Sequence, residues 1–275
     1  MKRFAFVFVA MLCSVSVWAQ DLSKDSTILS VSIAGRRTAF PLVSKHERGM
    51  VFARKKSFME DGVLYLYREY SYYQCDTCSG YQVDTSSYFV RPKAWKGYLE
   101  YLHRYTYWFS RDEGNKEYFA EAYNYLREKC PVLQHNQLGD VPRLWYPVVK
   151  FRGKYYISID NLTAVELTDS LVVYHDMEIA MSALLNFSKV GEDEYRWLEQ
   201  PEYFDGVDTV TIRPVKKVNG LYVMSTVRKE LGIEVHQLVT PEENIHNFDF
   251  IDWKSTDHIP DGLPYDTIDY ERLLK

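Results

Sequence analysis

Residues 63–74, Val-Leu-Tyr-Leu-Tyr-Arg-Glu-Tyr-Ser-Tyr-Tyr-Gln, form the stretch that decides the fold. The run is long, rich in aromatic side chains, and preceded by the turn-forming sequence Glu60-Asp61-Gly62. Aromatic residues favour the pleated, half-buried surface of a strand, so this segment predicts a long β-strand. Gln82 to Val90 has the same character, and the two runs together predict a hairpin with Cys75-Asp-Thr-Cys78 at its tip.

The rest of the chain shares this aromatic character. Its 275 residues include 23 Tyr, 14 Phe and 6 Trp, which favours β structure throughout. The length is sufficient to bury a substantial core in one large domain or two small ones. The rings either only build the sheet or, where several are exposed together, form a stacking surface for a sugar or another flat ligand.

The hydrophobic period changes between Pro92 and His135, where the spacing predicts two amphipathic helices. The sequence Asp112-Glu113-Gly114-Asn115 separates them, and Pro131 ends the second. The two helices are expected to form an αα-hairpin that covers a sheet. The expected apolar faces are Trp95, Leu99, Leu102, Tyr105 and Phe109 in the first helix, and Phe119, Ala122, Tyr123, Leu126 and Cys130 in the second.

From Trp145 onward the pattern returns to short strands separated by turns such as Arg152-Gly153 and Asn219-Gly220. Met177 to Leu185 fits either a strand or a helix, and Ile233 to Leu238 is expected to be the last strand. The acidic, aromatic tail from Thr240 to Lys275 is expected to pack as a loop against the sheet. The predicted fold is mainly β, an antiparallel meander closed as a barrel or folded as a sandwich, with an inserted αα-hairpin, and α+β overall.

The N-terminus has the pattern of a secretion signal. Lys2 and Arg3 precede an apolar run from Phe4 to Val17, and Val17-Trp18-Ala19 provides a cleavage site before Gln20. The predicted divisions are a signal peptide at 1–19, an N-terminal β segment at 20–91, a helical hairpin at 92–135 and a C-terminal β segment with the tail at 136–275; the alternative is a single domain over 20–275.

Charge and hydropathy exclude some partners. The net charge is −5, and removal of Lys2 and Arg3 with the signal peptide makes the chain more acidic, so we expect no nucleic-acid binding. No second apolar run approaches membrane length, so we expect no transmembrane segment.

Cys75 and Cys78 are the candidates for a local disulfide in an exported protein. A thioredoxin-type redox pair would need a helix after Cys78, and no helical pattern follows it. Zinc bound by Cys75, Cys78, Cys130 and His135 is a less favoured alternative, because the spacing of the second pair is loose. Cys130 is expected to be a buried free thiol at a helix end.

Common catalytic signatures are absent, including the Gly-x-Ser-x-Gly elbow, the Gly-rich phosphate loops and His-Glu-x-x-His, so we expect no cofactor and no metal. His175-Asp176 resembles a general-base pair, but adjacent residues of a strand point to opposite faces. The tail carboxylates Asp249, Asp252, Asp257 and Asp261 fit no calcium loop, and a solvated acidic surface is the favoured interpretation.

Four Asp-Ser or Asp-Thr segments followed by a mostly apolar residue, at Asp25, Asp169, Asp208 and Asp266, resemble the O-glycosylation acceptors of exported proteins in some Gram-negative gut and oral bacteria. A short signal followed by a Tyr-rich β chain is likewise similar to envelope proteins of such bacteria. The resemblance implies a periplasmic, extracellular or envelope-associated location, and it carries over no functional residues.

The sequence therefore favours a non-enzymatic binding or interaction module whose partner is a small molecule, a glycan or an envelope protein. The candidate contacts are the rings of the aromatic strand and of the helical region, namely Tyr65, Tyr67, Tyr70, Tyr72, Trp95, Tyr105 and Trp108. The alternative is a hydrolase of carbohydrate or peptide, which would bring two carboxylates together in an aromatic cleft and displace the pKa of at least one.

Overall fold

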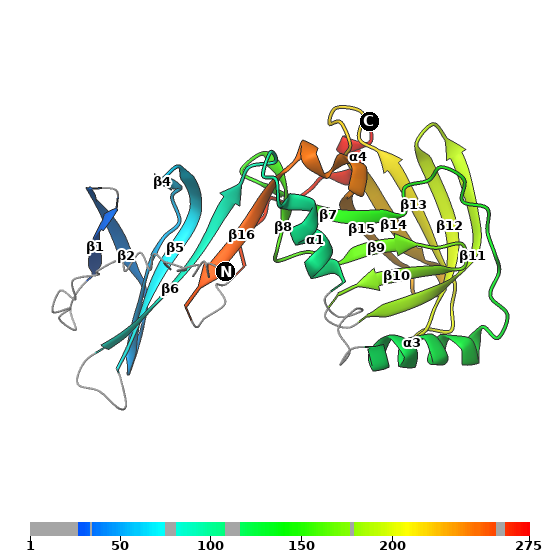
Figure 1. Cartoon of the computed structure of the whole chain (residues 1–275), viewed down its shortest axis with the longest axis horizontal. Coiled ribbons are helices and arrows are strands. Elements are labelled where there is room, and N and C mark those ends of the chain that lie inside the picture. Colours follow the sequence, from blue (N-terminus) through cyan, green and yellow to red (C-terminus); the bar gives the residue numbers. More distant parts are fainter. Residues whose placement is uncertain (1–26, 34, 75–80, 108–115, 177–178, 257–261) are drawn as a thin grey trace, which may run out of the picture.

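A computed structural model describes residues 27–33, 35–74, 81–107, 116–176, 179–256 and 262–275. The described chain is mostly strand, which confirms the mainly β prediction. The molecule is elongated, with a β-barrel at one end and an open, twisted sheet at the other (Figure 1). The predicted hairpin, made of the two strand-like runs on either side of residues 75–80, is confirmed, because Gln74 and Tyr81 are cross-strand partners.

Eight antiparallel strands close the barrel, since each pairs with the next and the last pairs back with the first. In spatial order they are β7 (Leu144–Phe151), β15 (Ile233–Pro241), β14 (Tyr222–Arg228), β13 (Asp208–Pro214), β12 (Glu194–Pro201), β11 (Ala180–Gly191), β10 (Leu171–His175) and β9 (Ala164–Leu167). The ambiguous segment around Met177 to Leu185 contributes β11, and its residues 177–178 lie outside the described chain.

The second sheet contains strands from both halves of the sequence. Its order is β2 (Arg36–His46), β3 (Gly49–Arg54), β5 (Val63–Gln74), β6 (Tyr81–Arg91), β16 (Asp249–Ser255), β8 (Lys154–Ser158) and then β7, while β1 (Ile28–Ile33) pairs with β2 and β4 (Phe58–Glu60) with β5. The pairing of β16 with β8 is parallel. Strand β7 belongs to both structures, because its last residues, Val149 to Phe151, pair with β8.

The expectation that Ile233 to Leu238 is the last strand was wrong, because β16 follows it inside the predicted tail. The centre of β16, from Phe250 to Asp252, is buried on both faces, so the segment lacks the alternation that identifies a strand in the sequence. Farther along the tail, Leu263 and Tyr265 pack against the sheet as expected.

Tight turns join two hairpins as the sequence predicted, whereas Asn219-Gly220 lies in a longer connection between Pro214 of β13 and Tyr222 of β14. Arg152 and Gly153 both have positive φ, as do Asp61 and Gly62. Positive φ at both central residues defines the type I′ turn, whose twist matches that of the flanking strands. Gly at the second position accommodates this backbone without steric cost.

Two inserted helices between β6 and β7 are also confirmed, but their buried side chains belong to two separate clusters and not to the joined faces of an αα-hairpin. α3 (Lys116–Lys129) lies along β11, where Leu126 packs with Met181 and Ala183. α1 (Tyr98–Thr106) packs near the junction of barrel and sheet. The short helical segments are η1 (Lys229–Leu231), η2 (Glu242–Asn247) and α4 (Tyr270–Leu273).

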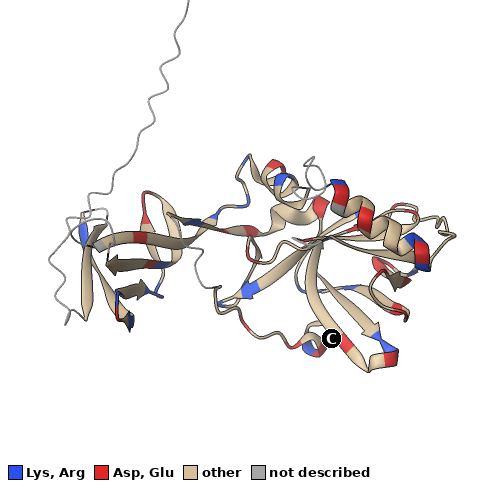
Figure 2. Cartoon of the chain, turned by 90° about the horizontal axis from the view of Figure 1, so that it is seen from below, with Lys and Arg blue, Asp and Glu red and all other residues tan. Residues whose placement is uncertain are grey.

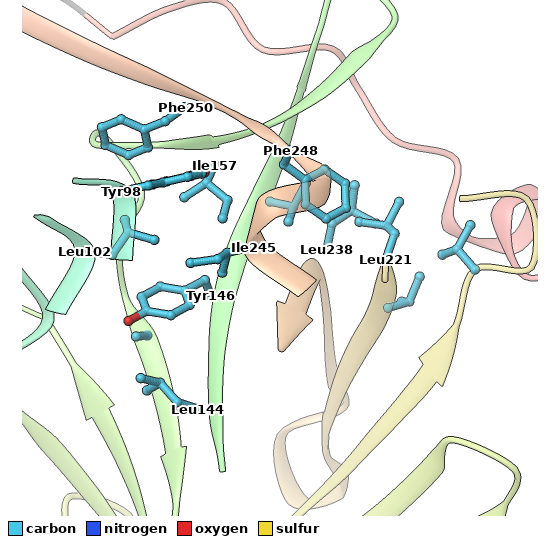
Figure 3. Close-up of a cluster of buried hydrophobic side chains, with 14 residues drawn as sticks. Tyr98, Leu102, Leu144, Tyr146, Ile157, Leu221, Leu238, Ile245, Phe248 and Phe250 are labelled. Carbon is cyan, nitrogen blue, oxygen red and sulfur yellow. The ribbon is translucent and has the colours of Figure 1, made fainter. Parts of the chain in front are cut away.

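The predicted face of the first helix was right at Leu102 and wrong at Leu99 and Tyr105, which are exposed. The other buried residues of α1 are Tyr98 and Thr106. The Tyr98 ring packs against Phe250 of β16 at a centroid distance of 5.7 Å. In Figure 3 the side chains of α1, β7, β8 and β16 meet in one cluster that joins the barrel to the sheet.

The barrel interior is filled by large side chains. Trp145 and Trp197 are fully buried there, together with aliphatic residues of the surrounding strands. The alternation along β12 places Tyr195, Trp197 and Glu199 toward the interior and Arg196 toward solvent. The interior is therefore a packed core into which the acidic side chain of Glu199 projects.

Docking of α3 on the barrel is tested by Leu126→Ala. Leu126 has no exposed surface, and its removal leaves a cavity against Met181 and Ala183. We expect the free energy of unfolding to fall by about 2–5 kcal/mol in urea titrations. The neighbouring Tyr125, half exposed on the same helix, provides the control. Tyr125→Ala is expected to change stability by about 0.5 kcal/mol or less, and equal losses in both variants would contradict the observed orientation of α3.

Candidate functional site

A row of alternating cations and aromatic rings crosses one face of the second sheet. We call it the cation–aromatic face. It comprises Phe58 of β4, Tyr65 and Arg68 of β5, Phe89 and Arg91 of β6, and Lys254 of β16.

Cross-strand register places these residues on the same side of the sheet. Tyr65 is opposite both Phe58 and Phe89, and Ser87 is opposite both Arg68 and Lys254. Side chains of directly opposite residues project from the same face. An irregularity in the pairing between Tyr65 and Tyr67 makes this possible, because it lets Tyr65 share a face with Arg68.

Each ring of the face contacts a cation. The Arg68 guanidinium lies 4.1 Å from the Tyr65 centroid and 5.1 Å from that of Phe58. The Lys254 ammonium lies 5.0 Å from the Tyr65 ring, and Arg91 lies 5.0 Å from the Phe89 ring. These separations fall within the range of cation–π attraction, about 6 Å.

Two carboxylates hold the arginines in place. Glu60 accepts a 2.5 Å hydrogen bond from Arg68 Nη2, and Asp252 accepts one of 2.6 Å from Arg91 Nε. Asp252 also accepts a hydrogen bond from Tyr101 Oη of α1, at 3.0 Å. Burial raises the pKa of the Tyr101 hydroxyl, and the charge of Asp252 raises that pKa further, so the tyrosine remains a proton donor.

Two structures cover the ends of this side of the sheet and leave its middle open. At one end β1 and β2 pack over Tyr70 and Tyr72. At the other end lies Trp95, which precedes α1 and has its ring 4.4 Å from the Arg91 guanidinium. Between these covers Tyr65 and Arg68 are buried, each with 5% of its surface exposed, while Phe58, Phe89 and Arg91 are half-buried and Lys254 is exposed.

The face contains some of the rings that the sequence proposed and excludes others. Tyr65 and Trp95 lie on it or beside it, whereas Tyr70 and Tyr72 are buried in the core under β1. Tyr67 projects from the opposite side of the sheet, among Leu66, Tyr88 and Ile251. Tyr105 is exposed on α1, 5.0 Å from the Tyr101 ring, and Trp108 lies outside the described residues.

The cations of the face were missed, and one acidic residue was misplaced. Arg68 and Arg91 lie in strand-like runs and Lys254 lies in the predicted tail, and no local pattern shows that they converge from three strands. Asp252 was assigned to a solvated acidic surface and is instead buried, with 1% of its surface exposed, against Arg91. Its place between two hydrophobic residues in Ile251-Asp252-Trp253 was the signal for a buried carboxylate.

Cys75 and Cys78 lie outside the described residues, so the proposed disulfide stays a prediction. Cys130 is a free, half-buried thiol just after α3, and burial raises its pKa. His135 Nδ1 is 2.8 Å from Asp169 Oδ2 at the surface. Within the described ranges, no group of three or more His, Cys, Asp or Glu residues has a geometry that holds a metal.

His175 has a different partner from the one suggested by sequence adjacency. Its Nε2 lies 2.7 Å from Glu166 Oε2 on the neighbouring strand, and its ring packs against the edge of Tyr107. Asp176 instead accepts a hydrogen bond from Thr163 Oγ1. The His175 side chain is buried beneath the end of α1, so the pair belongs to the packing of this helix on the barrel.

A second group of polar side chains lies inside the barrel. Glu199 is 2% exposed and accepts hydrogen bonds from Trp197 Nε1 and Tyr174 Oη, both at 2.7 Å, and from Ser182 Oγ at 3.2 Å. Its cross-strand neighbour Asp208 is equally buried.

Asp208 forms a two-point ion pair with Arg228, with N–O distances of 2.9 and 2.6 Å. Burial raises the pKa of the Glu199 carboxyl, and the nearby charge of Asp208 raises it further. Both carboxylates are thus fully engaged and closed off from solvent.

Comparison with known proteins adds no functional assignment. No family model matches the chain, and no curated protein and no solved structure is similar to it. The functional argument therefore depends on the geometry described above.

The raised pKa of Glu199 predicts a pH-dependent stability. The folded state holds the proton of the Glu199 carboxyl more tightly than the unfolded chain does. The free energy of unfolding should therefore decrease as pH rises from the ordinary pKa of glutamate, about 4.3, through the raised pKa of the folded state. Glu199→Gln removes this titration and is expected to flatten the slope in urea titrations between pH 5 and 8. Asp160 and Glu202, whose pKa values burial also raises, maintain part of the slope. Glu128→Gln, at an exposed position of α3, is the control, and an unchanged slope in Glu199→Gln would contradict the prediction.

Proposed function

We propose that this chain is an exported protein of the bacterial envelope that binds an acidic glycan, without catalysis, through the cation–aromatic face. The observation that carries the proposal is the alternation of rings and cations across β4, β5, β6 and β16, in which Phe58, Phe89 and Arg91 are half-buried and Lys254 is exposed. Core packing explains the buried rings of the sheet, but it does not explain the open middle of this face, where Lys254 is exposed.

The rings suit a flat ligand with apolar and polar parts. The Phe58 and Tyr65 rings are nearly parallel, with centroids 5.3 Å apart and an interplanar angle of 10°, and Phe89 lies 5.9 Å from Tyr65. A sugar presents apolar C–H groups that pack on such ring faces and hydroxyl groups that remain available to polar neighbours. The sheet holds these rings in position before binding, which reduces the entropy lost when a ligand is ordered.

The charges favour an acidic sugar over a neutral one. Acidic and basic residues are distributed over the whole molecule (Figure 2), and the chain carries a net charge of −5. On the cation–aromatic face the three cations Arg68, Arg91 and Lys254 outnumber the two carboxylates that accompany them, Glu60 and Asp252. Lys254, whose ammonium donates to Tyr65 Oη at 2.7 Å, is the cation available to a carboxylate or sulfate group.

The hydrolase alternative has one observation in its favour. Glu199 and Asp208 are neighbours in an aromatic environment, and the pKa of Glu199 is raised. Their oxygens already accept hydrogen bonds from Trp197, Tyr174, Ser182 and Arg228, and both side chains are closed off from solvent. A substrate would have to displace this packing, so a structural role inside the barrel suits these carboxylates better.

Binding is tested with an oligosaccharide of uronic acids and a neutral oligosaccharide of the same length. We expect the acidic ligand to bind more tightly, and its affinity to weaken as salt rises from about 50 to 300 mM. Lys254→Glu and Phe89→Ala are each expected to lower the affinity in isothermal titration calorimetry at least about tenfold, or about 1.4 kcal/mol.

Lys189→Glu is the matched control, because Lys189 is also an exposed lysine over a ring, that of Tyr195 on the barrel. It should bind like the unchanged protein. Equal affinity for the neutral and acidic sugars, or full affinity in Lys254→Glu, would reject the acidic-glycan proposal.

Export is supported by the sequence of residues 1–19, which lie outside the described chain. No helix in the described residues is long and apolar enough to cross a membrane. A signal peptide would place the mature chain in the periplasm or beyond it, where an envelope glycan is accessible.

Processing is tested by expressing the full chain in a Gram-negative host and measuring the intact mass of the exported protein. We expect the product to begin at Gln20, because Ala19 ends the predicted cleavage site. Replacing Leu12 in the apolar run with Arg should keep residue Met1 on the protein and leave it in the cytoplasm. Export of an uncleaved chain, or cytoplasmic retention of the natural sequence, would contradict the proposal.

A further inference from the structure

Half of one barrel strand lacks a neighbour along one edge. β15 pairs with β14 over residues 233–239, but its opposite edge pairs with β7 only over residues 238–241. In the described chain, residues 233–237 therefore present backbone N–H and C=O groups to no strand on this side.

Apolar side chains surround this free edge. Ile233 and Val235 are 45% and 57% exposed, and Leu231, in the turn before β15, is 55% exposed. Tyr203 of the loop after β12 lies at the same end of the barrel, because its ring is 5.9 Å from Arg228, the cross-strand partner of Ile233. Proteins normally protect a strand edge with charge, proline or a bulge, so an edge lined by β-branched residues indicates a partner.

Another edge strand in the described part of the chain differs in this respect. β1 is also an edge strand, and its exposed residues are Ile28, Ser30 and Ser32. Two of the three are small and polar. The apolar edge of β15 is thus a particular property of this strand.

We infer that residues 233–237 of β15 pair antiparallel with the same residues of a second copy of this chain, about a two-fold axis at Val235. In this register the three central residues, Glu-Val-His, are self-complementary, and Ile233 faces Gln237 of the partner subunit. Val235 faces Val235 of the partner subunit. Glu234 faces His236 of the partner subunit, and the symmetry repeats this acid–imidazole pair.

The present geometry favours this register. Glu234 and His236 project from the outer face of the strand, where the His236 Nε2 to Glu234 Oε1 distance is 3.5 Å. Nδ1 of His236 lies 2.8 Å from Ser225 Oγ, which holds the ring on this face. Ile233 and Val235 project from the opposite face, so pairing would bring four β-branched side chains of two subunits together. An interface of this type is isologous and closes at the dimer.

The dimer is tested by sedimentation equilibrium over a range of protein concentrations. We expect a reversible monomer–dimer equilibrium whose dissociation constant rises at least tenfold in Val235→Lys, because two lysines would face each other at the axis. Val190→Lys is the matched control, since Val190 is another strand valine of similar exposure, 52%. Circular dichroism of each variant shows whether the fold is intact. A monomer at every concentration, or a dimer unaffected by Val235→Lys, would overturn the inference.

The register is tested separately with Val235→Cys. Directly opposite residues in an antiparallel pair have Cα atoms about 4.5–5.5 Å apart, within reach of a disulfide. On oxidation we expect a covalent dimer on non-reducing gels for this variant, and none for Val190→Cys or for the natural chain with its own cysteines. Crosslinking of all three proteins alike, or of none, would contradict a two-fold axis at Val235.

Discussion

The pairing of a single strand, β7, determines how the two parts of the molecule are joined. Leu144 and Trp145 pair with β9 and close the barrel, the following residues pair with β15, and Val149 to Phe151 pair with β8 in the open sheet. Trp145 faces the barrel core and Tyr146 faces the cluster under α1. A shift of one residue would exchange these two faces. The eight residues of β7 thus fix the register of both sheets at once.

Buried carboxylates also connect separate strands and helices through their hydrogen bonds. An isolated buried charge is costly, and the cost is offset only where hydrogen bonds or opposite charges satisfy it. Asp252 meets this condition through Arg91 and Tyr101, and it thereby connects β16, β6 and α1. Arg91 is consequently held over the Phe89 ring. The geometry of the cation–aromatic face therefore depends on a buried carboxylate.

Local sequence patterns were sufficient to predict most strands and helices. They were insufficient to predict which side chains the fold brings together. The aromatic run at 63–74, the turn at Arg152-Gly153 and the two helices between Pro92 and His135 carry local periodicity or turn chemistry, and these predictions are confirmed. β16 was missed because burial on both faces removes the alternation that marks a strand. Arg68, Arg91 and Lys254 meet only after β16 inserts beside β6, so no spacing along the chain indicates their proximity. The Tyr65 ring was recognised, whereas its cationic neighbours were not.

The position of β16 also determines when the protein can fold. Its contacts with β5 and β6 join residues far apart in the sequence, with Lys254 bonded to Tyr65 across 189 positions and Asp252 to Arg91 across 161. Such long-range pairing slows folding, because large loops must close before the contacts form. The open sheet lacks its middle strand until the ribosome has released the last part of the chain. The strands of the barrel end at Pro241, so the barrel can close before β16 leaves the ribosome, and the open sheet is completed last.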